Sequence, residues 1–138
     1  MAWEATPLDN FTPIIKLEHS DSRGEIYSIT LPGDKELMLL HSKAGSLRGG
    51  HAHDVDEIVV MLTGRMRYHK RSEDGGEWQD EVKGGDTSFN QVGEYHMGEA
   101  LEDLWLLEWK IGTDKTGWKN IDYAPWREKV RGNMGVKA

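Results

Sequence analysis

The sequence predicts an all-β fold, a sandwich or a barrel, that ends in a short C-terminal helix. About ten short segments that suit β-strands recur along the chain, separated by turn residues. Sixteen glycines against four prolines supply the turns that many short strands require. With 138 residues, 37% hydrophobic and 30% charged, the chain is expected to form one globular domain over residues 1–138. The β core is expected over about 12–112 and a C-terminal extension over about 113–138.

The first part of the chain predicts three strands and a loop. Strands are expected over residues 11–18 and 25–29, separated by Asp21-Ser22-Arg23-Gly24, because these residue types favour turns. A second break, Leu-Pro-Gly-Asp, precedes a short apolar strand over residues 36–41. Residues 43–50 are expected to form a loop.

The central part predicts a buried strand and a hairpin. Residues 58–62 are apolar and rich in β-branched side chains, which is typical of a strand buried on both faces. Residues 65–69 alternate and lead into a turn around Glu-Asp-Gly-Gly at 73–76, and the chain returns over 78–82.

Residues 103–111 give the clearest alternation in the chain. One face carries Trp105, Leu107, Trp109 and Ile111, and the other carries Leu104, Leu106, Glu108 and Lys110. One of the two tryptophans is expected to line a ligand pocket, because such pockets are largely apolar and aromatic.

The end of the chain predicts a helix. Asp122 is a suitable N-cap, and Pro125 lies near the expected first turn. Trp126, Val130 and Met134 recur every four residues, so one helix face is expected to lie on the outside of the β core.

Four side chains predict a metal site. His51 and His53 project from the same face of an extended strand, and Glu57 has the same parity. His96 follows Gly93 and supplies a third imidazole. Imidazole and carboxylate groups gathered on one face are what a divalent metal needs. The predicted metal ligands are His51, His53, Glu57 and His96.

Two stretches resemble the motifs of the cupin superfamily. Residues 45–64 read G-x5-H-x-H-x3-E-x6-G and match the first motif at every defined position. Residues 85–100 match the second motif at its two glycines and its histidine, but Gln91 stands where the family usually has Pro and Ala100 where it usually has Asn. The resemblance implies a double-stranded β-helix, which is the jelly-roll barrel of cupins. It also implies a homodimer, which would cover exposed sheet edges.

Such a donor set predicts a catalytic centre. Three imidazoles and one carboxylate leave one or two positions open on a six-coordinate ion, which can be Fe, Mn, Ni, Cu or Zn. A redox metal would support dioxygenase chemistry, and any of these metals would support Lewis-acid isomerase, lyase or decarboxylase chemistry. Candidate contacts to a small polar substrate are Arg48, Tyr95 and Gln91, the first as a guanidinium clamp on an acidic group.

Two alternatives remain open. The D-x-R-G element at residues 21–24 and the R-G-x-H-A-H element at residues 48–53 resemble those of sugar-nucleotide ketoisomerases and epimerases, which share the jelly-roll fold. That resemblance implies metal-free acid–base catalysis by His51 or His53, with Arg48 holding the substrate. The other alternative is a small-molecule-binding cupin without turnover.

Composition argues against several other classes of protein. The net charge of −7 is opposite to that of a nucleic-acid-binding surface. The absence of cysteine excludes disulfides, thiol catalysis and thiolate ligands. No apolar run approaches the roughly 18 residues of a membrane span, and the first residues do not resemble a signal peptide. A cytoplasmic protein without nucleic-acid or membrane partners is therefore expected.

Overall fold

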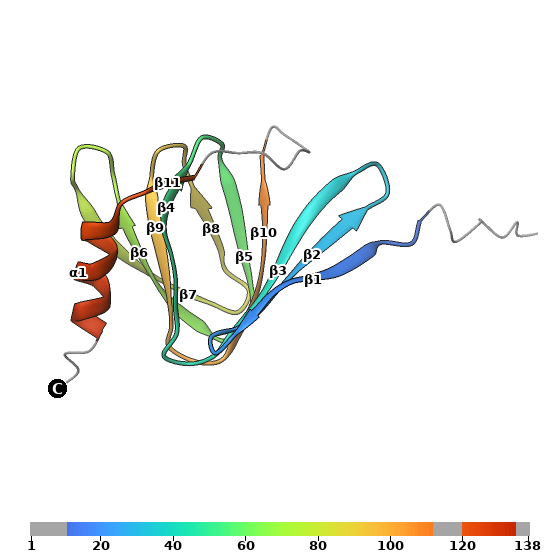
Figure 1. Ribbon diagram of the computed structural model, residues 1–138, viewed down its shortest axis with the longest axis horizontal. Coiled ribbons are helices and arrows are strands. Elements are labelled where there is room, and N and C mark those ends of the chain that lie inside the picture. The colour runs from blue at the N-terminus through green and yellow to red at the C-terminus, as the bar shows by residue number, and fades with distance from the viewer. Residues whose placement is uncertain (1–10, 112–119, 135–138) are drawn as a thin grey trace, which may run out of the picture.

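A computed structural model describes residues 11–111 and 120–134, in which eleven strands and one helix form two antiparallel sheets and an outer layer (Figure 1). The elements are β1 (Ile14–Asp21), β2 (Gly24–Leu31), β3 (Lys35–Ser42), β4 (Leu47–His53), β5 (Glu57–Thr63), β6 (Arg65–Arg71), β7 (Glu77–Lys83), β8 (Thr87–Asn90), β9 (Tyr95–Ala100), β10 (Leu104–Lys110), β11 (Asn120–Asp122) and α1 (Ala124–Met134). The sheets have the strand orders β1-β2-β3-β10-β5-β8 and β11-β4-β9-β6-β7. The predicted all-β class is confirmed.

The strand pairing is nested, which makes the fold a jelly roll. β6 pairs with β7, β5 with β8, β4 with β9 and β3 with β10, so strands successively further from the central hairpin pair with each other. This pairing brings together segments that are far apart in the sequence. In particular, it sets β4 and β9, which carry the two histidine motifs, side by side.

The core lies between the two sheets and follows the alternation of the strands. Val59 and Met61 of β5 are buried in it, together with Leu104 and Leu106 of β10. The apolar sequence of β5 predicts burial on both faces, but Leu62 is exposed, so the two faces are not equally buried. The alternation therefore decides which side chains reach the interior.

The helix α1 covers the outer face of the five-stranded sheet (Figure 1). Trp126 and Val130 are buried against Leu47 and Met97, and Met134 packs beside them. The predicted helix and its apolar face are confirmed. Among the residues that the structure describes, no helix is long and apolar enough to cross a membrane.

The first three strands extend away from the rest of the barrel (Figure 1). β1 pairs only with β2 in the described sheet, so it forms an edge. Ile15 and Leu17 of this strand are 63% and 51% exposed. The edge is therefore both unpaired and apolar.

Candidate metal centre

A β-bulge in β4 shapes the site. Arg48 pairs with Gly98 of β9 and His51 pairs with His96, so three steps along β4 match two steps along β9. The extra residue lies at Gly49 and Gly50, whose φ angles of 107° and 98° suit glycine. Without the bulge Arg48 and His51 would face opposite sides, whereas here both line one cavity.

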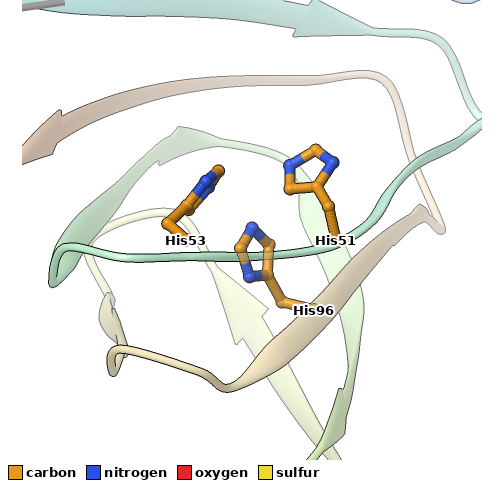
Figure 2. Close-up of side chains that lie close together, drawn as sticks. All are labelled: His51, His53 and His96. Atoms are coloured by element: carbon orange, nitrogen blue, oxygen red, sulfur yellow. The ribbon is translucent and has the colours of Figure 1, made fainter. Parts of the chain in front are cut away.

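Three imidazoles converge beside this cavity. His51 and His53 come from β4 and His96 from β9, and their side chains point toward one another (Figure 2). The potential ligand nitrogens all lie within 4.8 Å of one another. Ring centroids are 4.8 to 5.1 Å apart, and His53 and His96 are buried. Metal–nitrogen bonds of about 2.1 Å require nitrogens no more than about 4.2 Å apart, so the rings would close slightly around one ion.

The environment keeps these histidines in the form that binds metals. Burial lowers the pKa of His96 to about 3, although Glu57 acts in the opposite direction. Burial also lowers the pKa of His51, and His53 adds to this effect. Both rings are therefore neutral near pH 7, and neutral imidazole is what a metal ion requires.

Glu57 lies at the edge of the histidine group. Its carboxylate oxygens are 3.6 Å from His53 Nε2 and 3.7 Å from His96 Nε2. However, the Lys110 ammonium donates to Oε2, and Asn90 Nδ2 donates to Oε1 over 2.9 Å. The structure therefore brings the fourth predicted ligand to the site, but with both oxygens already hydrogen-bonded.

The pKa of Glu57 is lowered by neighbouring charge. Burial alone would raise this pKa, but the positive charges of His96 and Lys110, together with the hydrogen bond from Lys110, outweigh burial. Because His96 is itself neutral near pH 7, the standing positive charge is that of Lys110. Glu57 is thus an ionised carboxylate held by an ammonium group.

A cavity of about 340 Å³ adjoins the histidines. His51 and His96 form one part of its wall, and the guanidinium-bearing residues Arg23 and Arg48 form another. Arg48 donates to Ser42 Oγ over 2.9 Å and to the His41 carbonyl oxygen over 3.2 Å. These bonds orient a cation whose pKa is lowered by burial and by the charge of Arg23. Among the described residues no carboxylate forms an ion pair with Arg48, so this part of the cavity suits an anionic group.

Sequence reasoning missed two charged residues inside the barrel. Glu108 lines the cavity, and Lys110 lies beside Glu57. Burial, followed by the charge of Glu57, raises the pKa of Glu108 to about 8, while Lys110 and Arg48 act in the opposite direction. The available signal was parity, since both residues share the face of β10 that carries Leu104 and Leu106.

Other predicted contacts lie away from the cavity. Tyr95 projects from the opposite face of β9 to His96, and its ring packs 5.8 Å from Tyr123 beneath α1. Gln91 is exposed in the turn between β8 and β9. Trp105 faces outward, where its ring stacks 4.6 Å from that of His41. Of the three predicted substrate contacts, the structure brings only Arg48 to the cavity.

Comparisons with known proteins agree on the fold. No protein-family model matches the chain, and no curated protein sequence matches it. The capsular polysaccharide assembling protein CapF from Staphylococcus aureus is similar in structure, with a TM-score of 0.66 and 20% identity over 85% of this chain and 35% of that chain. A variant of oxalate decarboxylase from Bacillus subtilis has a TM-score of 0.65 and 22% identity over 94% of this chain and 36% of that chain. The formate complex of oxalate decarboxylase from Lactobacillus farciminis has a TM-score of 0.65 and 15% identity over 94% of this chain and 40% of that chain. This chain thus spans well under half the length of these proteins, and the likeness shows the fold alone.

Proposed function

Since the chain has the cupin fold, we propose that it is a metal-dependent enzyme that acts on a small polar organic substrate. The observation that supports this proposal is the group formed by His51, His53 and His96 at the wall of a cavity. A volume of about 340 Å³ suits a small molecule. A substrate in this cavity would lie within reach of the ion that the histidines would hold.

The donor set decides which metals fit. Three imidazoles, two of them buried, suit Fe, Mn, Ni, Cu and Zn, and the histidine geometry does not discriminate among them. Bacillus subtilis oxalate decarboxylase, a structural neighbour, contains Mn(II) centres. When bound, such an ion supplies either O2 activation for a dioxygenase or Lewis-acid polarisation for an isomerase or lyase.

Residues of the chain itself prepare the substrate. Arg48 would bind an anionic group, because its guanidinium is fixed by Ser42 and faces the cavity. Glu108 would hold a proton near neutral pH, since its pKa is raised to about 8 by burial and by Glu57. Leu104 and Leu106 form an apolar wall that excludes water.

Metal analysis combined with O2 uptake tests this function. Untagged protein is analysed by mass spectrometry, and O2 consumption is then followed after loading with Fe(II), in the presence of candidate catechol, thiol, diketone and oxo-acid substrates. Substrate-dependent O2 uptake would identify a dioxygenase, and turnover without O2 uptake would identify Lewis-acid chemistry. Binding without any product would instead identify a small-molecule-binding protein. Failure to retain any of the five metals after reloading would contradict the proposal.

A second candidate function is suggested by two arginines that line the same cavity. Arg23 of the D-x-R-G element lies in the turn between β1 and β2, where Asp21 pairs with it, and Arg48 of the R-G-x-H-A-H element lies on β4, yet both line the same cavity. Two guanidinium groups suit the diphosphate of a sugar nucleotide. His51 or His53 would then transfer a proton beside a keto sugar without a metal. Solvent deuterium exchange into a keto-sugar nucleotide by chelator-treated protein, followed by proton NMR, would support this candidate.

We also propose that the chain forms a homodimer. The edge strand β1 exposes Ile15 and Leu17, and an unpaired apolar edge is a liability unless a partner covers it. A second copy would supply a matching edge by two-fold symmetry.

A further inference from the structure

We infer that Lys110 keeps Glu57 from acting as a fourth ligand, so that the chain binds its divalent ion through three histidines alone. This inference rests on the proposed metal-dependent function and specifies the ligand set within it. It assigns a positioning role to Lys110, a residue that belongs to neither histidine motif.

The contact between Lys110 and Glu57 is built into the sheet. The two residues are direct partners where β10 pairs with β5, and both point into the barrel. Their side chains are 7% and 1% exposed, and the ammonium donates to Glu57 Oε2. Because a cross-strand pair is fixed by the register, this contact does not depend on a flexible loop.

The other oxygen of Glu57 is held as firmly. Asn90 Nδ2 donates to Glu57 Oε1 over 2.9 Å and lies 2.7 Å from the hydroxyl oxygen of Tyr68. Lys70 Nζ donates to Asn90 Oδ1 over 2.8 Å and therefore fixes the amide orientation. Glu57 thus accepts hydrogen bonds at both oxygens from donors that are themselves fixed.

A metal ion that used Glu57 as a ligand would meet the ammonium of Lys110. The ion and the ammonium would then share one carboxylate in a buried space where water screens little. Two positive charges repel there, and binding of the ion to Glu57 would break the hydrogen bond that Lys110 donates to it. The three histidines offer ring nitrogens that Lys110 does not occupy.

This arrangement also determines which ligand the centre favours. Glu57 and Lys110 cancel each other's charge, so the protein donors leave the two positive charges of the ion uncompensated. Arg48 adds a further positive charge to the same cavity. The structure therefore favours a small dianion that chelates the metal, and oxalate is a suitable probe of this property.

Four proteins test the inference: the wild type, Glu57→Gln, Lys110→Met and the double variant. Mn(II) binding to each is measured by titration with electron paramagnetic resonance detection. We expect Lys110→Met to tighten the wild-type Kd by at least about tenfold, because the freed carboxylate of Glu57 then joins the ligands. In the double variant that gain should be lost. Lys110→Arg, which keeps the charge, should bind Mn(II) like the wild type.

The Co(II)-loaded forms give a second readout. Lys110→Met should show a changed visible absorption spectrum, because a carboxylate joins the coordination sphere, whereas Glu57→Gln should leave the wild-type spectrum unchanged. Oxalate should bind the Mn(II)-loaded wild type at least about tenfold more tightly than it binds Mn(II)-loaded Lys110→Met.

Two results would overturn the inference, and they are distinguishable. If Lys110→Met binds Mn(II) no more tightly than the wild type, Lys110 does not control the ligand role of Glu57, and the metal-dependent function stands. If none of the proteins binds Mn(II), Co(II) or the other candidate metals, the proposed function fails as well. Should Lys110→Met not fold, the double variant, whose Gln–Met pair buries no charge, must bind Mn(II) with about the affinity of the wild type, whose Glu–Lys pair is neutral overall.

Discussion

His51 and His96 are direct partners across β4 and β9, and this single pairing turns two distant motifs into one site. The ring centroids are 5.1 Å apart, close enough for both imidazoles to bind one ion. The nested strand order of the jelly roll produces the pairing, and the bulge at Gly49 and Gly50 sets its register. Site and fold therefore depend on the same backbone feature.

Removal of one imidazole should abolish metal retention and leave the barrel folded. We expect His53→Ala and His96→Ala each to lose the metal, because two remaining histidines bind weakly, while circular dichroism stays that of the wild type. His19→Ala is the matched control, since the His19 side chain is exposed on β1 and contacts Asp21 two residues along the same strand. Full metal occupancy in either site variant, by mass spectrometry, would refute the ligand assignment.

The bulge should tolerate no side chain at Gly49. An alanine Cβ there would lie 2.6 Å from the His96 carbonyl oxygen, at a φ of 107°. We expect Gly49→Ala to lower the free energy of unfolding by at least about 1–3 kcal/mol and to reduce metal stoichiometry. Gly33→Ala shares the positive φ but has nothing within 4 Å, so it should cost less stability than Gly49→Ala and bind metal normally. Urea unfolding that ranks the two variants equally would argue against the close approach.

Acid should destabilise the metal-free protein through His96. Its pKa is lowered from 6.5 to about 3, chiefly by burial, so between these values the unfolded chain binds a proton that the folded chain does not. The free energy of unfolding should therefore fall as pH drops below 6.5, by at most about 1.4 kcal/mol per pH unit for this group. Urea unfolding from about pH 7 to about pH 5 should show a smaller loss for His96→Gln than for the wild type. Equal losses would assign the acid sensitivity to other groups.

Glu108 should act in the opposite direction. Its pKa is raised from 4.5 to about 8 by burial and by Glu57, so between these values the folded chain holds a proton that the unfolded chain has lost. Stability should fall as pH rises through this range. We expect Glu108→Gln to match the wild type at about pH 5 and to exceed it at about pH 9. Glu102→Gln, at an exposed position, should show no such gain in stability over the wild type at about pH 9.

The homodimer can be tested at its proposed edge. We expect the mass of the wild type in solution to be twice 15.7 kDa, and Leu17→Glu to shift it toward a monomer by burying a charge in the interface. Lys16→Glu, also on β1, is the control because Lys16 is already charged and exposed. Light scattering that finds a monomeric wild type would contradict the proposal.

The sequence predicts the grouping of the histidines well, because side chains alternate between the two faces of a strand and the spacing of the motifs follows that alternation. His51 and His53 share a face by the period of two, and the cupin-like spacing adds His96. The same rule separates Tyr95 from His96, since neighbouring residues on β9 face opposite sides. Tyr95 accordingly packs against Trp126 of α1, on the other side of β9 from the histidines.

The interior of β10 was harder to predict. Alternation shows that Trp105 and Trp109 share one face with Glu108 and Lys110 on the other, but it does not show which face is inward. The more hydrophobic tryptophan face is the natural choice, yet Leu104 and Leu106 face the core and carry the two charged residues with them. Pairing with Glu57 across the sheet, which only the fold reveals, compensates the buried ammonium.

The most direct test of the metal centre is the metal-to-chain ratio of untagged wild type and His96→Ala after reloading and desalting, determined by mass spectrometry. The three-histidine centre predicts close to one divalent ion per chain in the wild type and essentially none in His96→Ala. A wild type that retains no metal, or a variant that retains as much as the wild type, would contradict it.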